Sequence, residues 1–366
     1  MRNILVIDSW SGLGGGQRVA FDLASGLRSK QTFVYMAPIG PYFEFYQKEG
    51  IMTREIRAKS LFCTILEIRC ALKQISPEIV HVHGTRAAIW TRLAFITLRR
   101  KPKFVYTVHG FHLVHKKGVL RFLLLTLERF LNRYTDAMVC VCKHDYDTIV
   151  ALKCMDSKKI SVILNGINID YWKIEIPLPI SLPFVSQGVN VIGVINRLHA
   201  PKDVATILRA FANLKSDFQK SIVLMIVGDG PLRSEMETYA KKLCIDQNVF
   251  FVGDQNDVRP FLHLCDIVVV SSLWEGLCLG VLEAGACKKP VVVSNFIGVE
   301  EVVVSEKTGL TFPIGSSELL KKQLRCLLDS PELRKKVGNT AYDFVQERFF
   351  LARMLVAYEE IYERFF

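Results

Sequence analysis

The sequence lacks any long uninterrupted apolar run of the kind that crosses a membrane. A spanning helix needs about 18 consecutive apolar residues, and no window of the 366-residue chain approaches that length. Residues 1–10 hold only a short apolar run after one arginine, too brief for the apolar region and cleavage site of a signal peptide. We therefore expect a cytoplasmic protein without an integral membrane segment, whose chain begins as a buried strand.

Regular cysteine spacing is also missing. The ten cysteines show no paired pattern typical of zinc sites, and several lie in apolar runs, where cysteine behaves as a small hydrophobic residue. Short repeats and low-complexity tracts, which would indicate a solenoid or a disordered segment, are not seen either. No basic strand interleaved with aromatic residues supports nucleic-acid binding. The composition thus predicts a reduced globular protein with neither a metal cluster nor a nucleic-acid partner.

Acidic residues are scarce in the first half of the chain relative to basic ones. The net charge is +11 overall, and residues 1–185 carry 26 Lys and Arg against 14 Asp and Glu, whereas residues 186–366 carry 21 against 22. All the excess positive charge therefore lies in the first half. This asymmetry favours a polyanion or an anionic membrane surface as a partner of that half. The simpler alternative is a solvated basic face that maintains solubility.

Apolar strand-like runs alternate with helical patterns along most of the chain, which at 50% hydrophobic content is too long for one ordinary core. One series of runs comprises residues 4–8, 33–37, 79–83, 104–110, 137–142 and 161–166, and a second comprises 190–195, 222–230, 248–254, 266–272, 289–295 and 309–313. Between the two series lie three prolines with no helical period. This alternation is typical of parallel, doubly wound sheets.

We therefore predict an α/β fold with two Rossmann-like domains that face each other across a cleft. The N-terminal domain is expected at residues 1–175 and would bind the acceptor, and residues 176–188 would form the linker. The C-terminal domain is expected at 189–345 and would bind the donor, and a helix at 346–366 would return to the N-terminal domain. Ligands of such sheets bind outside the carboxyl ends of the strands.

Residues 271–295 carry two glutamates after a predicted strand. Glu275 lies in the turn, and Glu283 lies about two turns along a helix that is expected to begin near Leu277. Gly276 beside the helix N-terminus exposes backbone N–H groups, which suit a diphosphate or a sugar hydroxyl. A carboxylate accepts two hydrogen bonds from a vicinal diol, so Glu283 suits a ribose and Glu275 a pyranose. The alternative is a pair of ordinary surface or capping glutamates.

Two cations lie five residues apart on the loop after the first strand of the second domain. Arg197 offers a planar fork and Lys202 a point charge, and together they can clamp a diphosphate and stabilise the charge that grows as it departs. A solvated basic loop is the alternative.

A glycine-rich loop at residues 12–18 follows the first predicted strand. Its glycines let backbone N–H groups approach a phosphate or a sugar ring, and Gly15 and Gly16 are the strongest candidates. Gln17 stands where the dinucleotide fingerprint needs its third glycine, which counts against NAD. A plain tight turn is the alternative.

Two first-domain strands end in histidine and glycine. His109 and His83 are candidates for the cleft, although histidine at a strand end is often a core or capping residue. We expect His81 and His83 to point to opposite faces of their strand, which disfavours a histidine triad around a metal.

These motifs together resemble the retaining glycosyltransferases of family 4, the group 1 enzymes with the GT-B fold. The resemblance covers nearly the whole chain. It implies that Glu275 lies near the transferred sugar, that Glu283 holds the ribose of the nucleotide, and that Arg197 and Lys202 neutralise the diphosphate. The sequence departs from the family at two positions, since Asn196 and Asp203 stand where the family has glycine.

The resemblance also assigns the remaining candidates. It places Gly15 and Gly16 beside the donor diphosphate and acceptor, and His109 beside the donor sugar and its phosphate. Gly276 and Leu277 would bind the donor at the helix start, Gly230 would lie near the base, and Asn165 would face the cleft where the chain crosses between domains. No cofactor is expected, because the nucleotide sugar is a substrate and the reaction needs no metal.

One amphipathic segment leaves two interpretations open. Residues 114–134 place apolar side chains at helical spacing with basic ones around them: Val119, Phe122, Leu123, Leu127, Phe130 and Leu131 among Lys116, Lys117, Arg121, Arg129 and Arg133. The helix would either lie on anionic headgroups or pack as an ordinary Rossmann helix. The aromatic cluster at residues 42–46 would likewise meet a lipid acceptor or belong to the core.

The sequence thus predicts a hexosyltransferase that moves a sugar from a UDP- or GDP-sugar to an acceptor hydroxyl with retained configuration. The preferred acceptor is a polyprenyl-diphosphate-linked saccharide in bacterial surface polysaccharide synthesis, namely capsule, O-antigen or exopolysaccharide. The enzyme would then be peripheral on the inner face of the plasma membrane. A nucleotide-sugar 2-epimerase of the same fold and a catalytically silent partner subunit are the alternatives.

Overall fold

The computed structural model describes residues 1–185, 188–218 and 221–366 and divides into two compact units. The first unit contains Met1–Gly166 and Ala352–Phe366, and the second contains Ile167–Leu351. The predicted domain limits at residues 175, 189 and 345 are not tested by this division and stay predictions. Of the predicted linker 176–188, residues 186–187 lie outside the described part of the chain.

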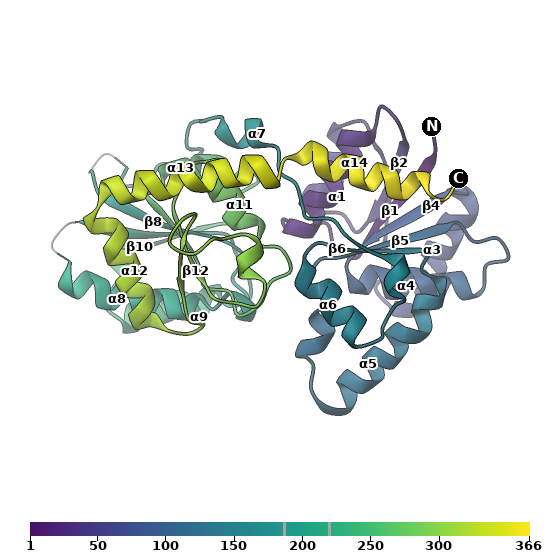
Figure 1. Ribbon diagram of the computed structural model, residues 1–366, viewed down its shortest axis with the longest axis horizontal. Helices are drawn as coiled ribbons and strands as arrows, with labels where there is room; N and C mark the ends of the chain where they lie inside the picture. The colour runs from purple at the N-terminus through teal and green to yellow at the C-terminus, as the bar shows by residue number, and fades with distance from the viewer. Residues whose placement is uncertain (186–187, 219–220) are drawn as a thin grey trace. The chain divides into compact units, whose positions relative to one another are not determined.

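The first unit is built on a seven-stranded parallel sheet with the strand order β3-β2-β1-β4-β5-β6-β7 (Figure 1). Its strands are β1 (Asn3–Asp8), β2 (Thr32–Ala37), β3 (Met52–Glu55), β4 (Ile79–His83), β5 (Lys103–Val108), β6 (Ala137–Cys140) and β7 (Ile160–Val162). The middle strands are buried along their length because helices cover both faces.

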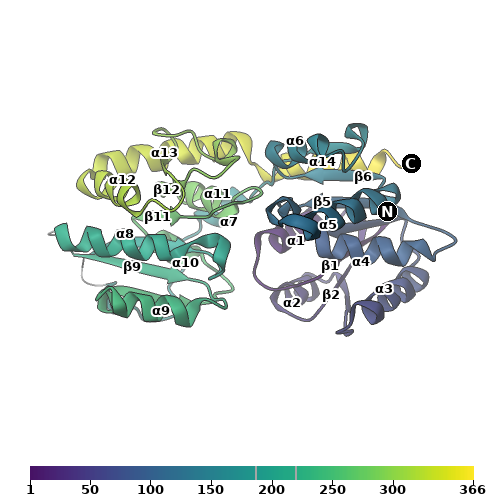
Figure 2. The same ribbon diagram turned by 90° about the horizontal axis from the view of Figure 1, so that it is seen from below.

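The helices of the first unit are α1 (Gly15–Leu27), α2 (Pro41–Lys48), α3 (Leu61–Ile75), α4 (Thr85–Ile96), α5 (Gly118–Leu131), α6 (Lys143–Ala151) and most of α14 (Leu351–Glu363). Figure 2 shows α3, α4 and α5 side by side along one face, and α4 packs against both of its neighbours. The C-terminal helix α14 is held to the sheet by two tyrosines, since Tyr362 Oη lies 2.7 Å from His81 Nδ1 and Tyr358 Oη lies 3.0 Å from Thr107 Oγ1.

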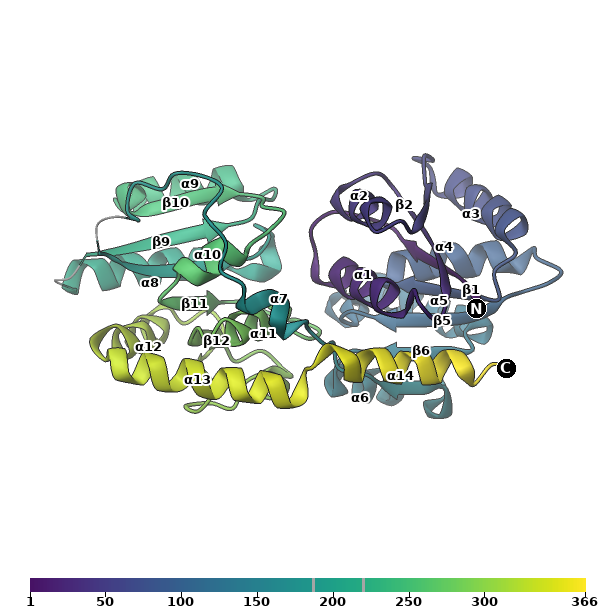
Figure 3. The ribbon, with the colours of Figure 1, turned by 90° about the horizontal axis from the view of Figure 1, so that it is seen from above.

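The second unit repeats the parallel arrangement with six strands in the order β10-β9-β8-β11-β12-β13 (Figure 3). These strands are β8 (Asn190–Ile195), β9 (Ile222–Val227), β10 (Val249–Gly253), β11 (Ile267–Val270), β12 (Val291–Ser294) and β13 (Leu310–Phe312). The helices are α7 (Ile169–Lys173), α8 (Val204–Asp217), α9 (Arg233–Lys242), α10 (Arg259–Leu264), α11 (Leu279–Ala286), α12 (Ser317–Asp329) and α13 (Pro331–Arg348). Together the units confirm the predicted α/β fold with two Rossmann-like domains.

Each of the predicted apolar runs overlaps a strand, but β3 has no counterpart among them. Its residues Met52 to Glu55 lie at the edge of the sheet with half-exposed or exposed side chains, so no continuous apolar run is needed there. Several predicted runs also extend past the ends of their strands. Gly228 ends one such strand with a φ of +124°, which turns the chain out of the extended conformation.

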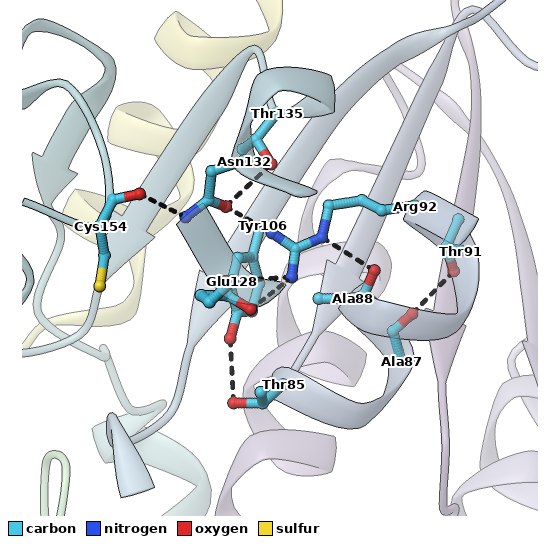
Figure 4. A network of polar contacts seen from close by, with 10 residues as sticks. All are labelled: Thr85, Ala87, Ala88, Thr91, Arg92, Tyr106, Glu128, Asn132, Thr135 and Cys154. Atoms are coloured by element: carbon cyan, nitrogen blue, oxygen red, sulfur yellow. Dashed lines mark hydrogen bonds and ion pairs between the residues drawn. The ribbon is translucent and has the colours of Figure 1, made fainter. Parts of the chain in front are cut away.

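A buried ion pair joins α4 to α5 (Figure 4). Arg92 and Glu128 are both fully buried, and the guanidinium donates two hydrogen bonds to the carboxylate at 2.8 and 3.0 Å. Arg92 also donates to Asn132 Oδ1 and to the Ala88 carbonyl, and Asn132 donates to the Cys154 carbonyl at 2.8 Å. The charge is therefore compensated within the core, where an unpaired charge would be very costly.

We expect Glu128→Gln to destabilise the protein by about 3 kcal/mol, because it leaves the Arg92 charge buried without a counter-ion. The free energy of unfolding in urea measures this loss. The matched control is Asp147→Asn, which neutralises an acid in the exposed Lys143–Asp147 pair and should cost less than about 1 kcal/mol. Equal stability of the two variants would contradict the assigned role of the Arg92–Glu128 pair.

Candidate functional site

The second unit brings two of the predicted catalytic residues into direct contact. Lys202 Nζ forms an ion pair with Glu275 Oε1, and both side chains are mostly buried. Ser272 Oγ donates to the same carboxylate oxygen at 2.6 Å. Glu275 is thereby held by a cation and a hydroxyl, and the ammonium group of Lys202 is fixed in place at the carboxyl edge of the sheet.

The strand order explains why these residues meet. Strands β8 and β11 are neighbours, so the loops that follow them emerge side by side. Ser271 Oγ donates to the Lys202 carbonyl at 2.6 Å, and the Leu273 N–H donates to the Pro201 carbonyl at 2.8 Å. These bonds tie the loop that carries Lys202 to the loop that carries Glu275.

Arg197 lies on the same loop after β8, within the electrostatic influence of Glu275. Desolvation by neighbouring protein atoms lowers the pKa of its guanidinium, although its side chain is exposed, while the carboxylates of Glu275 and Asp254 act in the opposite direction. Two cations and two carboxylates therefore share this edge of the sheet. The guanidinium of Arg197 and the ammonium group of Lys202 can each donate charge-assisted hydrogen bonds to the oxygens of an anionic ligand.

One of the two departures from the family pattern, Asp203, has a local structural explanation. Asp203 adopts a left-handed backbone conformation with a φ of +43°, which favours glycine and which aspartate tolerates better than most residues. Its carboxylate accepts a hydrogen bond from Thr206 Oγ1 at 2.7 Å, and Lys202 pairs with Glu275 instead. For Asn196, neither amide atom has a hydrogen-bond partner within the described residues, and both atoms are buried.

The helix that carries Glu283 starts later than predicted. Helix α11 begins at Leu279, so Glu283 lies about one turn along it rather than two. Gly276 and Leu277 are buried in the turn before the helix. Cys278 is the N-cap residue, and its side chain makes no capping hydrogen bond to the helix. Gly276 and Leu277 thus lie beside the first N–H groups of the helix, which can donate hydrogen bonds to a phosphate or hydroxyl ligand.

Gly230 occupies a position where the backbone of two loops approaches closely. Its φ is +158°, and a Cβ atom there would lie 2.4 Å from the Leu198 carbonyl oxygen. Leu198 in turn donates its N–H to the Asp229 carbonyl at 2.8 Å. Gly230 thereby supports the loop that carries Arg197, a packing role that the sequence did not predict. Its expected place near the nucleotide base stays a prediction.

In the first unit, the glycine-rich loop packs directly against His109. Helix α1 begins at Gly15, and a Cβ atom on Gly16 would lie 3.1 Å from His109 Cδ2. His109 Nε2 lies 2.9 Å from His83 Nδ1, and the two rings stack with their centroids 5.2 Å apart. The structure thus brings together Gly16, His109 and His83, which lie far apart in the sequence.

The expectation that His81 and His83 point to opposite faces of the strand is wrong. Their ring centroids lie only 4.3 Å apart, because residues two apart in a strand share one face. Burial lowers the pKa of His81 to about 3 and that of His109 to about 4, so both rings are neutral near pH 7. No group of three potential metal ligands gathers here or elsewhere in the described parts of the chain.

Asp8 is a candidate site residue that the sequence reasoning missed. It ends β1 next to His83 in the register of the sheet, is fully buried, and accepts hydrogen bonds from Tyr35 Oη at 3.2 Å and Gln17 Nε2 at 3.4 Å. Burial raises its pKa from 3.8 to about 7. An acidic residue at the carboxyl end of an otherwise apolar strand was the available signal.

Two further predicted features lie in the first unit. Asn165 is 2% exposed, and its Oδ1 atom has no hydrogen-bond partner among the described residues. In the aromatic cluster at residues 42–46, Tyr42, Phe43 and Tyr46 are buried, and the Tyr46 ring stacks on Tyr35 at 3.8 Å. These three aromatic residues therefore belong to the core and do not form a lipid-facing surface.

Two Rossmann-like units, each built on a parallel sheet, are the architecture of the GT-B glycosyltransferases. Comparison with protein families agrees in both halves. The family described as "Glycosyl transferases group 1" matches residues 184–344, and "Glycosyltransferase Family 4" matches residues 13–171. The chain belongs to the family 4 group of these enzymes.

Two relatives and one solved structure are similar to this chain. The chain is 28% identical over 252 residues to UDP-Gal:alpha-D-GlcNAc-diphosphoundecaprenol alpha-1,3-galactosyltransferase of Escherichia coli, covering 67% of this chain and 65% of that enzyme. It is 28% identical over 287 residues to N-acetyl-alpha-D-glucosaminyl L-malate synthase of Bacillus anthracis, covering 78% and 74%. Anabaena HepE in complex with UDP-glucose matches with a TM-score of 0.86 at 18% identity over the full length of both chains, which shows the shared fold.

The buried Asp8 carboxyl makes the stability of this site depend on pH. Between about pH 4 and pH 7 the unfolded chain has released the Asp8 proton while the folded chain retains it. The stability that Asp8 contributes therefore falls as the pH rises through this window, by about 1.4 kcal/mol per pH unit at most. We expect Asp8→Asn to be more stable than the wild type by roughly 2–4 kcal/mol near pH 8, and the difference to vanish near pH 4.

Urea unfolding of both proteins over this pH range measures the difference. The control is Asp343→Asn, which changes an exposed acid on α13 and should show no comparable pH-dependent gap. A constant difference between Asp8→Asn and the wild type at all pH values would contradict a protonated Asp8 in the folded protein.

Proposed function

We propose that this glycosyltransferase moves a hexosyl group from a UDP- or GDP-sugar to an acceptor hydroxyl with retained anomeric configuration. The observation that carries the proposal is the joining of Lys202 to Glu275 at the carboxyl edge of the second sheet, with Arg197 on the same loop. Cations fixed in advance stabilise the charge of a departing nucleoside diphosphate without reorganising during the reaction.

In the proposed step, the bond between the anomeric carbon and the diphosphate oxygen breaks, and the acceptor oxygen bonds to the same face of that carbon. The acceptor proton passes to an oxygen of the leaving diphosphate. Lys202 and Arg197 neutralise the developing negative charge, and Glu275 orients Lys202 and a hydroxyl of the sugar. None of the protein groups changes its covalent bonding, and the step is proposed without a metal ion.

The other candidates would bind and orient the donor. Glu283 would accept hydrogen bonds from the ribose hydroxyls, while the N–H groups at the start of helix α11, after Gly276 and Leu277, would contact phosphate or sugar oxygens. In the first unit, Gly15, Gly16 and His109 would face the diphosphate and the sugar, with Asn165 nearby. The low pKa of His109 keeps its ring neutral, so the ring serves as a hydrogen-bonding group and not as a cation.

The proposed acceptor is a saccharide on a polyprenyl diphosphate, as used in the synthesis of bacterial capsule, O-antigen or exopolysaccharide. Support comes from the undecaprenol-linked acceptor in the name of the Escherichia coli relative and from the excess positive charge of residues 1–185. A lipid-linked acceptor places the enzyme on the inner face of the plasma membrane. No helix within the described ranges is long and apolar enough to cross a membrane.

The direct test is to incubate the purified protein with a panel of UDP- and GDP-sugars and watch for slow hydrolysis, then to add a polyprenyl-diphosphate saccharide as acceptor. We expect one nucleotide series to be hydrolysed, and the lipid-linked acceptor to accelerate release of the nucleotide. Conversion of the nucleotide sugar without an acceptor into its 2-epimer would favour an epimerase. Calorimetry that detects neither UDP nor GDP binding would favour a silent subunit.

We expect Lys202→Ala and Arg197→Ala each to lower turnover by about 100-fold or more, because each removes a positive charge that would face the leaving group. Initial rates with the active nucleotide sugar measure the effect. Lys322→Ala, which removes an exposed lysine from α12 of the same unit, serves as the charge-matched control. Turnover within about threefold of the wild type for both clamp variants would show that the clamp assignment is wrong.

A further inference from the structure

Helix α5 directs most of its large apolar side chains away from the protein. Val119, Leu120, Phe122 and Leu123 are exposed by 75%, 54%, 65% and 57%, and Phe130 two turns later is exposed by 43%. At 3.6 residues per turn, Val119, Phe122, Leu123 and Phe130 share one side of the helix. Side chains of this kind normally face the core of a Rossmann domain.

The opposite side of α5 explains this orientation. Leu125 and Leu131 are buried there, and between them lies Glu128, which is bound to Arg92 of α4 (Figure 4). The buried ion pair fixes the rotation of the helix, because turning the apolar side inward would expose the pair and separate the charges. The outward orientation of the apolar side is therefore determined by packing inside the domain, and does not result from fraying at the end of the helix.

The exposed apolar side chains are accompanied by cations. Lys116, Lys117 and Arg121 are exposed around the start of the helix, and the Arg133 guanidinium lies 3.8 Å from the centroid of the Phe130 ring. Residues 112–134 contain a single acidic residue, the buried Glu128. We call Lys116–Leu123 together with Phe130 and Arg133 the α5 patch, which is apolar, basic and free of exposed acid.

We propose that the α5 patch docks the enzyme on an anionic lipid bilayer, with the apolar side chains inserted at headgroup level and the cations bound to lipid phosphates. This inference rests on the proposed function, since a polyprenyl-linked acceptor would be reached at that surface. The lysines and arginines of the patch complement the negative charge of an anionic headgroup layer. Exposed aromatic and aliphatic side chains flanked by lysine and arginine are the composition of an interfacial helix.

A bilayer fits the patch better than a protein partner or a second copy of this chain. The residues from Gly118 to Leu123 are all exposed, so the first turns of α5 are accessible from every side. Fluid lipid can surround such a projecting helix, whereas a folded partner covers one face of it. A second copy would also bring cations against cations, which is unfavourable without intervening acid.

The test measures co-flotation of the protein with vesicles of phosphatidylcholine that contain about 30% phosphatidylglycerol. We expect L120S/F122S/L123S to weaken vesicle binding by about tenfold or more, because insertion of the apolar side chains is lost. K116Q/K117Q/R121Q should weaken it by a similar factor at low ionic strength, with a smaller effect in about 1 M salt, where charges are screened.

Matched controls separate the patch from general effects of polarity and charge. L319S replaces an exposed leucine on α12, and K335Q/K336Q removes two exposed lysines on α13. Both controls should float like the wild type. Vesicle binding that is unchanged in both α5 variants would overturn the proposal, as would a wild-type protein that fails to bind anionic vesicles.

Two further measurements keep this proposal distinct from the proposed function. UDP or GDP binding by calorimetry and hydrolysis of the nucleotide sugar in solution should be the same for the α5 variants and the wild type. If the wild type binds nucleotide but not vesicles, the docking proposal fails and the enzymatic proposal stands. Light scattering that shows a dimer in the wild type and a monomer in L120S/F122S/L123S would overturn the lipid assignment in favour of a second copy.

Discussion

Parallel pairing of buried strands is the constraint on which both units depend. The central strands are covered by helices on both faces, so their backbone groups bond to one another and most of their side chains are apolar. Polar side chains are then confined mainly to the strand ends and the loops that follow. Because β8 and β11 are neighbours, the loops that follow them lie side by side. This adjacency brings Lys202 and Glu275 together.

The same constraint organises the first unit. In the register of the sheet, Asp8 at the end of β1 lies beside His83 at the end of β4, and His83 lies beside Thr107 of β5. His109 follows β5, and its Nε2 atom lies 2.9 Å from His83 Nδ1. Burial keeps the histidines neutral and holds a proton on Asp8 up to about pH 7. This edge therefore offers hydrogen-bonding groups, whereas the edge of the second unit offers fixed charge.

Helix α5 shows how a polar contact inside a domain determines the outer surface. A helix with an apolar stripe would ordinarily pack that stripe inward. The Arg92–Glu128 pair instead occupies the inner side, with Asn132 and the Ala88 carbonyl completing the hydrogen bonds of the guanidinium. Since breaking such a pair is costly, Phe130 stays on the outer side of the helix, in line with the exposed apolar side chains of the first turns. The surface chemistry of this region thus depends on a contact in the interior.

The sequence by itself determined the strand series, the two Rossmann-like domains and the motifs with Arg197, Lys202, Glu275 and Glu283, because apolar periodicity and local spacing are properties of neighbouring residues. It missed β3, whose edge position needs no apolar run, and it placed the start of α11 too early. Only the tertiary structure decided that Lys202 pairs with Glu275 and that Gly16 touches His109, since these contacts join residues far apart in the chain. The tertiary structure also decided which side of α5 faces the interior. The helical pattern marks which residues share a side, whereas the distant Arg92 determines which side is buried.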